Sequence, residues 1–128
     1  MGNVLGVGID LVSISEIRDL DERTKGAFIQ RTFTERERQD AVGASNDYEF
    51  LAGRFAVKEA VFKAINGNFP DKDFDFRQVE TIKLSNGAPK FNANKELLKL
   101  MNDIGAKDIL VSISNQGDFA IAIAELIG

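Results

Sequence analysis

Residues 50–65 read FLAGRFAVKEAVFKAI and lie within the longest helical pattern of the chain, which runs from Tyr48 to Ile65. The segment is apolar almost all the way round, so we expect a helix that is largely buried. It ends at Asn66-Gly67, a pair that is typical of a left-handed helix end. Its charged residues are Arg54, Lys58, Glu59 and Lys63. A buried central helix therefore decides the fold, and its few charges are the first candidates for function.

Two of these charges, Glu59 and Lys63, lie on the same side of the predicted helix, because residues four apart are separated by about 40°. Phe55 and Phe62 flank Glu59 on this side, and a carboxylate is costly to bury without a cation. One interpretation is an ordinary ion pair between Glu59 and Lys63 on a thin solvated strip. The other is an anion site beside a metal-binding carboxylate. The helical period is compatible with both.

Strands are predicted on either side of this helix. Residues Val4–Val12 form an apolar, β-branched run whose glycines permit close approach of another backbone. Val79–Leu84 alternates between apolar and polar residues, and a turn at Ser85–Pro89 follows it. Two more alternating segments, Ile109–Ser114 and Phe119–Leu126, are predicted to pair as a hairpin. These segments indicate a mainly antiparallel sheet.

The remaining segments are predicted to be helices and loops. Ser13–Asp40 is mostly helical in pattern, and Thr34 with Glu37 forms a capping box that starts a short helix. Asn94–Ile104 has apolar residues at helical spacing, and Asn68–Asp75 reads as a loop. Strands at both ends with helices between them predict an α+β fold, with a mainly antiparallel sheet packed against a long buried helix. With 128 residues, we expect one domain, residues 1–128.

The composition excludes several kinds of chemistry. The chain has no cysteine, which excludes disulfides and thiolate metal sites, and no histidine, so acid–base chemistry must use a carboxylate, a shifted lysine or metal-bound water. A net charge of −4 argues against a general nucleic-acid binder. No apolar run approaches the roughly 20 residues of a membrane span, and the N-terminus has no signal core. We therefore expect a cytoplasmic protein that binds neither nucleic acid nor membrane.

Asp10 follows the apolar residues of the first predicted strand. An aspartate at a strand end is often only a cap for the following turn. Paired with Glu59, it could instead complete a two-carboxylate Mg²⁺ site, since Mg²⁺ commonly takes one or two carboxylates and shares phosphate oxygens. Sequence spacing does not say whether the two carboxylates meet. From the residues alone, we therefore predict a candidate Mg²⁺ and phosphate site and nothing more specific.

Taken together, these segments resemble the holo-acyl-carrier-protein synthases, the small type of 4′-phosphopantetheinyl transferase. The resemblance covers nearly the whole chain, and its most specific stretch is Phe50–Ala64. The shorter matches are, in chain order, Gly8–Val12, Phe33–Glu37, Asn86–Pro89, Val111–Ser114 and a closing alanine-rich strand. The resemblance implies the 4′-phosphopantetheinyl transferase fold.

The resemblance also assigns residues. Asp10 and Glu59 match the family's magnesium ligands, and Lys63 matches a lysine that contacts the phosphates of coenzyme A. Arg54 matches a basic residue of the coenzyme site. The residues that match segments lining the adenine and 3′-phosphate end are Asn86, Gly87 and Pro89 of the turn, with Ser114 and Asn115. In the family these two segments come from a neighbouring subunit, because the small synthases are homotrimers with sites at the interfaces.

The implied reaction transfers 4′-phosphopantetheine from coenzyme A to a serine of an apo acyl carrier protein, and it supports fatty acid biosynthesis. Mg²⁺ bridges the diphosphate of the coenzyme, Lys63 stabilises the leaving phosphate, and adenosine 3′,5′-bisphosphate is released. Because the chain has no histidine, we expect Glu59 or a metal-bound water to accept the serine proton. The residues implied in catalysis are Asp10, Glu59 and Lys63.

Two positions depart from the family. Asn115 stands where the family usually has histidine; its amide can still hydrogen-bond a phosphate or ribose but carries no charge. Glu16 stands where the family usually has an arginine that docks the acidic carrier, so either Arg18 takes over this contact or a different carrier docks. Two alternatives stay open: a coenzyme A-binding homologue without transferase activity, which the missing histidine motivates, and a transferase domain excised from a multi-domain synthase.

Overall fold

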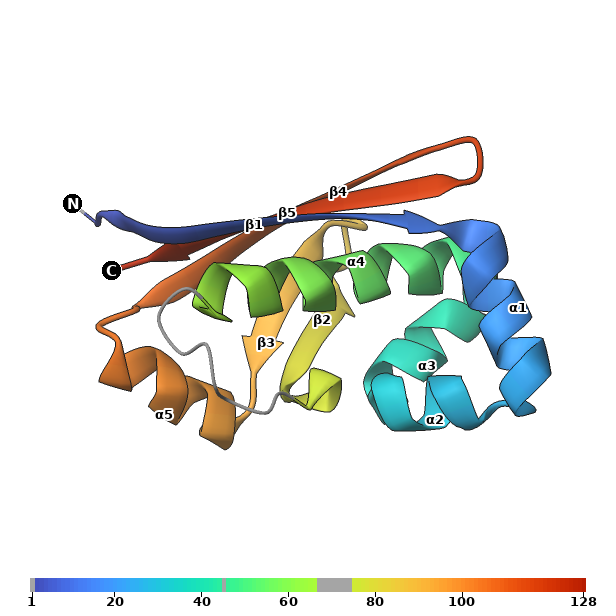
Figure 1. Cartoon of the computed structure of the whole chain (residues 1–128), viewed down its shortest axis with the longest axis horizontal. Coiled ribbons are helices and arrows are strands. Elements are labelled where there is room, and N and C mark those ends of the chain that lie inside the picture. The colour runs from blue at the N-terminus through green and yellow to red at the C-terminus, as the bar shows by residue number, and fades with distance from the viewer. Residues whose placement is uncertain (1, 45, 67–74) are drawn as a thin grey trace.

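The structure is a computed structural model that describes residues 2–44, 46–66 and 75–128. Figure 1 shows its elements. In chain order they are β1 (Val4–Ser13), α1 (Ile14–Thr24), α2 (Ala27–Thr32), α3 (Glu35–Val42), α4 (Asp47–Asn66), the 3₁₀ helix η1 (Phe76–Gln78), β2 (Val79–Lys83), β3 (Pro89–Ala93), α5 (Lys95–Asp103), β4 (Asp108–Gln116) and β5 (Phe119–Ile127). The described helices include none that is long and apolar enough to cross a membrane.

The strands form two antiparallel sheets, which confirms the predicted mainly antiparallel arrangement. The larger sheet has the order β1-β5-β4, and the smaller one pairs β2 with β3. In the larger sheet Asp10 lies opposite Ala122, which in turn lies opposite Ile113. The two strands of the predicted hairpin, β4 and β5, therefore pair as expected, with β1 on the other side of β5.

Helix α4 covers one face of the larger sheet and forms the centre of the core. In Figure 1 it runs along the three strands, with α1, α2 and α3 at one end and α5 towards the other. Its fully buried apolar residues include Ala56, Val57 and Ala60, which confirms the prediction of a largely buried helix. The β5 residues Ala120 and Ala122 are also buried, because they lie on the face of the sheet that packs against α4.

The predicted helix starts are also seen. The region from Ser13 to Asp40 contains α1, α2 and the start of α3, and Thr34 and Glu37 form the predicted capping box. The Asn94 side chain caps α5 by accepting a hydrogen bond from the Leu97 backbone N–H. Gly67 of the predicted helix stop and residues 68–74 of the predicted loop lie outside the described residues.

Strand β3 was not predicted, because its short sequence Pro-Lys-Phe-Asn-Ala carries a weak strand pattern. It pairs with β2 across the predicted turn, where Gly87 has a φ of 86°. A residue with a side chain rarely adopts this backbone conformation, so glycine at this position favours the turn and with it the β2–β3 hairpin.

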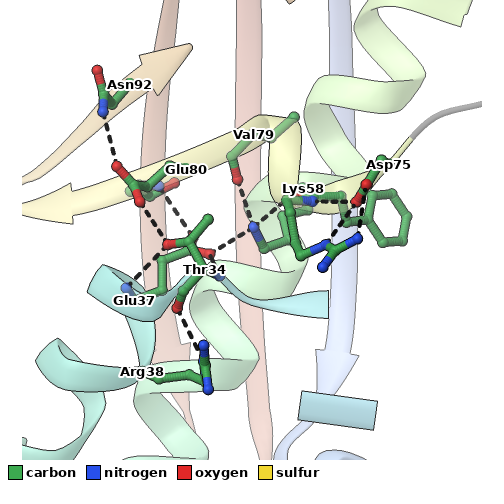
Figure 2. Close-up of polar contacts among 11 residues, drawn as sticks. Thr34, Glu37, Arg38, Lys58, Asp75, Val79, Glu80 and Asn92 are labelled. Atoms are coloured by element: carbon green, nitrogen blue, oxygen red, sulfur yellow. Dashed lines mark hydrogen bonds and ion pairs between the residues drawn. The ribbon is translucent and has the colours of Figure 1, made fainter. Parts of the chain in front are cut away.

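Lys58, the charged residue next to Glu59 on α4, is completely buried, and Figure 2 shows the polar contacts around it. Its ammonium group donates to Glu37 Oε1 at 2.8 Å, to the Phe76 carbonyl at 2.8 Å and to the Val79 carbonyl at 2.5 Å. The Glu37 carboxylate, also fully buried, accepts further hydrogen bonds from the backbone N–H groups of Thr34 and Thr81. This network fixes α3, η1 and β2 against α4. Sequence reasoning did not predict it.

Candidate active site

The structure brings Asp10 of β1 and Lys63 of α4 into contact. The Lys63 ammonium donates to Asp10 Oδ1 at 3.0 Å and to the Ile9 carbonyl at 3.0 Å. The Asp10 side chain is 17% exposed and that of Lys63 is 50% exposed, so the pair lies at the surface of the protein. Asp10 lies inside β1, which continues to Ser13, and Ser13 caps the following helix. The alternative in which Asp10 is only a turn cap is therefore wrong.

Two glycines of β1 make this contact geometrically feasible. A Cβ atom on Gly8 would lie 1.8 Å from the Ala60 carbonyl oxygen, and one on Gly6 would lie 2.3 Å from that of Ala64. Both distances are far below van der Waals contact, so only glycine lets the strand lie directly on the helix backbone. The predicted close approach is confirmed, and Asp10 is carried with the strand to the middle of α4.

Glu59 lies on the same side of α4 as Lys63 and is half-buried. Burial raises the pKa of its carboxyl group, the negative charge of Asp10 raises this pKa further, and Lys63 lowers it. The negative charges of Asp10 and Glu59 therefore repel each other, and Lys63 beside them partly offsets this repulsion. We expected either a Glu59–Lys63 ion pair or a metal-binding carboxylate; the ion pair that the structure contains joins Lys63 to Asp10.

This donor set fits a magnesium ion by its chemistry. The described residues contain no group of three or more acidic side chains that could hold a metal, so the protein would supply two ligands, Asp10 and Glu59. Two carboxylates are the number that Mg²⁺ commonly takes from a protein, with water and substrate phosphate completing its coordination. A divalent cation between them would also offset the repulsion that raises the Glu59 pKa.

Arg54 lies on a different side of α4. It is five residues before Glu59, which places it about 140° away around the helix axis. Its side chain is 7% exposed, its guanidinium carbon lies 4.0 Å from the centre of the Phe50 ring, and its Nε has no hydrogen-bond partner. Burial lowers the pKa of this guanidinium. Arg54 is therefore a buried cation that lies over an aromatic ring and has an unsatisfied donor.

Arg54 lines a surface hollow of about 240 Å³, which we call the Arg54 hollow. Its lining residues are Gly43, Ala44, Asn46, Glu49, Phe50, Gly53, Arg54, Lys83, Ile113 and Asn115. Of the predicted coenzyme-site residues, the structure thus brings Asn115 together with Arg54. Lys83 and Glu49 were not predicted, although a charged residue near the end of the predicted strand Val79–Leu84 and one at the start of α4 are visible in the sequence.

The other predicted site residues lie elsewhere. Ser114 is opposite Ile121 and points to the sheet face away from α4, as Leu11 does. Asn86 and Gly87 are exposed in the β2–β3 turn, where the Asn86 side chain accepts a hydrogen bond from the Ala88 N–H. Pro89 begins β3 and lines a groove against β4. Within one chain these residues do not line the Arg54 hollow.

The two carrier-docking candidates are both exposed on α1. Glu16 lies in its first turn, and Arg18 forms an exposed ion pair with Asp19 at 3.6 Å. An exposed pair of this kind contributes little to stability, so Arg18 is free to exchange Asp19 for another acidic group.

The chain matches one family of known proteins along almost its whole length. The family model of the 4′-phosphopantetheinyl transferase superfamily matches residues 6–124. A holo-[acyl-carrier-protein] synthase of Desulforudis audaxviator is 37% identical over 125 residues, covering 98% of this chain and 94% of that protein.

Solved structures of holo-[acyl-carrier-protein] synthases have the same fold as this chain. The crystal structure of the holo-[acyl-carrier-protein] synthase of Neisseria meningitidis superposes with a TM-score of 0.86 at 27% identity, covering 97% of this chain and 98% of that one. The Helicobacter pylori synthase in complex with coenzyme A superposes with a TM-score of 0.75 at 29% identity, covering 94% and 98% of the two chains. By sequence and fold alike, this chain belongs to the holo-[acyl-carrier-protein] synthases of the 4′-phosphopantetheinyl transferase superfamily.

Proposed function

We propose that this enzyme transfers 4′-phosphopantetheine from coenzyme A to a serine of an apo acyl carrier protein and releases adenosine 3′,5′-bisphosphate. We further propose that Asp10 and Glu59 hold a Mg²⁺ ion, that residues 1–128 act as a single domain, and that the reaction supports fatty acid biosynthesis in the cytoplasm. Family membership and the coenzyme-bound H. pylori relative support the transfer. The observation that carries the site is the contact of Asp10 with Lys63, on the face of α4 that also bears Glu59.

Each residue of this cluster has a role that follows from its surroundings. Asp10 and Glu59 would hold the Mg²⁺ ion, which would supply charge neutralisation to the coenzyme. The half-exposed Lys63 ammonium exchanges part of its contact with Asp10 for an oxygen of the leaving phosphate and stabilises the charge that develops there. Asp10, which is more buried, keeps the lysine oriented towards this position.

The reaction balances without a histidine. The carrier serine Oγ attacks the β-phosphorus of coenzyme A, a new O–P bond forms, and the P–O bond to the α-phosphate breaks. The electron pair of that bond stays on adenosine 3′,5′-bisphosphate. Glu59 accepts the serine proton, because the chain has no histidine and the other carboxylate of the cluster, Asp10, is paired with Lys63.

The face of the larger sheet that points away from α4 supports a homotrimer. Its exposed apolar residues are Val7, Ile9 and Leu11 on β1, Leu110 on β4, and Ile121 and Ile123 on β5. They form one surface, because Ile9 lies opposite Ile123 and Leu11 lies opposite Ile121. A contiguous apolar surface of this kind marks a protein–protein contact. We propose that three copies of the chain cover these faces, as in the small synthases.

The positions of Lys63 and Arg54 on opposite sides of α4 support active sites that are shared between subunits. Lys63 lies 180° from Arg54 around α4, since they are nine residues apart. A helix with its side chains is about 10 Å across, which is too thick for one coenzyme molecule to contact Lys63 with its diphosphate and Arg54 of the same chain with its nearby 3′-phosphate. We therefore propose that Asp10, Glu59 and Lys63 of one subunit face the Arg54 hollow of its neighbour.

The metal assignment is tested by the Mg²⁺ dependence of turnover in Asp10→Ala. We expect transfer to fall by about 100-fold or more, with a higher Mg²⁺ requirement for the residual activity. Asp103→Ala removes an exposed aspartate at the end of α5 and serves as the matched control, in which both the rate and the Mg²⁺ requirement should be unchanged. An unchanged Mg²⁺ dependence in Asp10→Ala would show that the metal is bound elsewhere.

The shared site is tested by mixing subunits. Asp10→Ala and Arg54→Ala damage different halves of the proposed site, so each variant alone should be nearly inactive. If the halves come from different subunits, random reassembly of both variants leaves about a quarter of the interfaces intact, and activity returns to that level. If both halves belonged to one chain, no intact site would form and the mixture would stay inactive.

A protein that binds coenzyme A but never transfers it would support the non-catalytic alternative.

A further inference from the structure

The Arg54 hollow contains two ionisable residues, Lys83 and Glu49, that have no role in the reaction described above. Lys83 is the last residue of β2, and its backbone N–H donates to Asp40 Oδ2 at 3.2 Å. This bond anchors the backbone while the side chain remains exposed. In the described part of the chain, the Lys83 ammonium forms no ion pair. Lys83 therefore brings a free positive charge to the hollow that already holds Arg54.

Arg54 shows that the hollow is built for an anion. The Arg54 residue is only 7% exposed, and its Nε is buried without an acceptor that would replace the lost water. Stacking on Phe50 holds the group in place but gives Nε no hydrogen bond. An unsatisfied buried donor is costly, so an acceptor that binds in the hollow gains more than it would at an exposed arginine.

Glu49 opposes an anion at this position. Among the described residues that line the hollow, it is the only negatively charged one, and its Oε1 accepts a hydrogen bond from Asn115 Nδ2 at 3.4 Å. A phosphate that enters must compete with this carboxylate for the Asn115 amide and must tolerate its charge. The hollow therefore contains two cations that favour a phosphate and one carboxylate that disfavours it.

We propose that Lys83 and Glu49 set how strongly the Arg54 hollow binds the 3′-phosphate of coenzyme A, with Lys83 strengthening binding and Glu49 weakening it. The inference rests on the proposed function, which makes coenzyme A the ligand. The ligand group is a phosphate monoester, whose charge of nearly −2 at neutral pH responds to each nearby charge. Because Asn115 itself is neutral, Lys83 and Arg54 are the two positively charged residues in the described lining of this hollow.

The test compares two ligands that differ only in this phosphate. Isothermal titration calorimetry measures the Kd of coenzyme A and of 3′-dephospho-coenzyme A for the full-length protein. In Lys83→Met we expect coenzyme A to bind about fivefold more weakly, because the lysine is exposed and its contribution is screened, while 3′-dephospho-coenzyme A keeps its Kd. In Glu49→Gln we expect coenzyme A to bind about threefold more tightly, again without a change for the dephosphorylated ligand.

Lys99→Met is the matched control, because it makes the same charge change on α5, outside the hollow. It should leave both Kd values unchanged, and circular dichroism checks that every variant is folded. The inference is overturned if Lys83→Met weakens both ligands equally or neither of them, or if Glu49→Gln weakens coenzyme A. A wild-type protein that binds neither ligand would instead contradict the proposed function itself.

Discussion

Replacing Lys58 by methionine should destabilise the protein more than any other single lysine change on α4. Methionine has nearly the same length, so the substitution removes the ammonium group without opening a large cavity. It removes three hydrogen bonds at once, to Glu37 and to the carbonyls of Phe76 and Val79 (Figure 2). The Glu37 carboxylate then stays fully buried with two backbone N–H donors and no cation.

The expected cost is about 3–5 kcal/mol, the usual result of breaking a buried ion pair by removing one partner. Desolvation lowers the pKa of the Lys58 ammonium and Glu37 opposes this, so the pair depends on both members. Typical domains have about 5–15 kcal/mol of stability in total, so the variant should be close to unfolding. With a urea m-value of about 2 kcal/mol/M, the midpoint should fall by about 2 M.

Urea unfolding followed by circular dichroism measures this shift. Lys63→Met is the control on the same helix; its ion pair with Asp10 is half-exposed on the lysine side, so we expect a loss within about 1 kcal/mol. The double variant Glu37→Gln/Lys58→Met removes both charges and should be more stable than Lys58→Met alone. A loss below about 1 kcal/mol in Lys58→Met, or a double variant no more stable than the single one, would refute a charged buried pair.

Two further predictions concern Tyr48 and Gly8. Tyr48 is the only tyrosine, and its hydrogen bond to Asp21 raises its pKa to about 12, so its ultraviolet titration should have a midpoint near that value and move towards 10 in Asp21→Asn. Because the folded protein holds this proton more tightly, the associated stability is present below pH 10 and is lost between about pH 10 and 12. Gly8→Ala should cost about 3 kcal/mol in thermal or urea unfolding, because its Cβ would overlap the Ala60 carbonyl. Gly43→Ala, at a helical φ of −80° with no close neighbour, should change stability by less than about 1 kcal/mol; equal effects at both glycines would contradict the close approach of β1 to α4.

Patterns that act over a few residues were predictable from the sequence. The buried helix around Phe50–Ile65, the capping box of Thr34 and Glu37, and the β4–β5 hairpin each depend on local spacing. The strand β3 was missed because its pairing depends on the β2–β3 turn more than on its own composition. The glycines of β1 predicted a close approach, but only the fold shows that the partner is the backbone of α4.

The site was predictable in its residues and less so in its arrangement. Family resemblance selected Asp10, Glu59 and Lys63, but the meeting of Asp10 with Lys63 depends on how β1 crosses α4, which no spacing encodes. Lys58, which is fully buried, could not be distinguished from the half-exposed Lys63 by sequence pattern, because both are lysines of one helix. Lys83 and Glu49 are far apart in the chain, and only the folded hollow brings them together with Arg54.

The transferase function and its metal are tested together by the intact mass of an apo acyl carrier protein incubated with this enzyme, coenzyme A and MgCl₂. We expect a mass gain of about 340 Da on the carrier, which is the 4′-phosphopantetheine group, and loss of this gain when EDTA removes the metal. Transfer that persists in EDTA would contradict the role of Mg²⁺ at Asp10 and Glu59. No gain on several carrier proteins, from an enzyme that still binds coenzyme A, would contradict the transferase function itself.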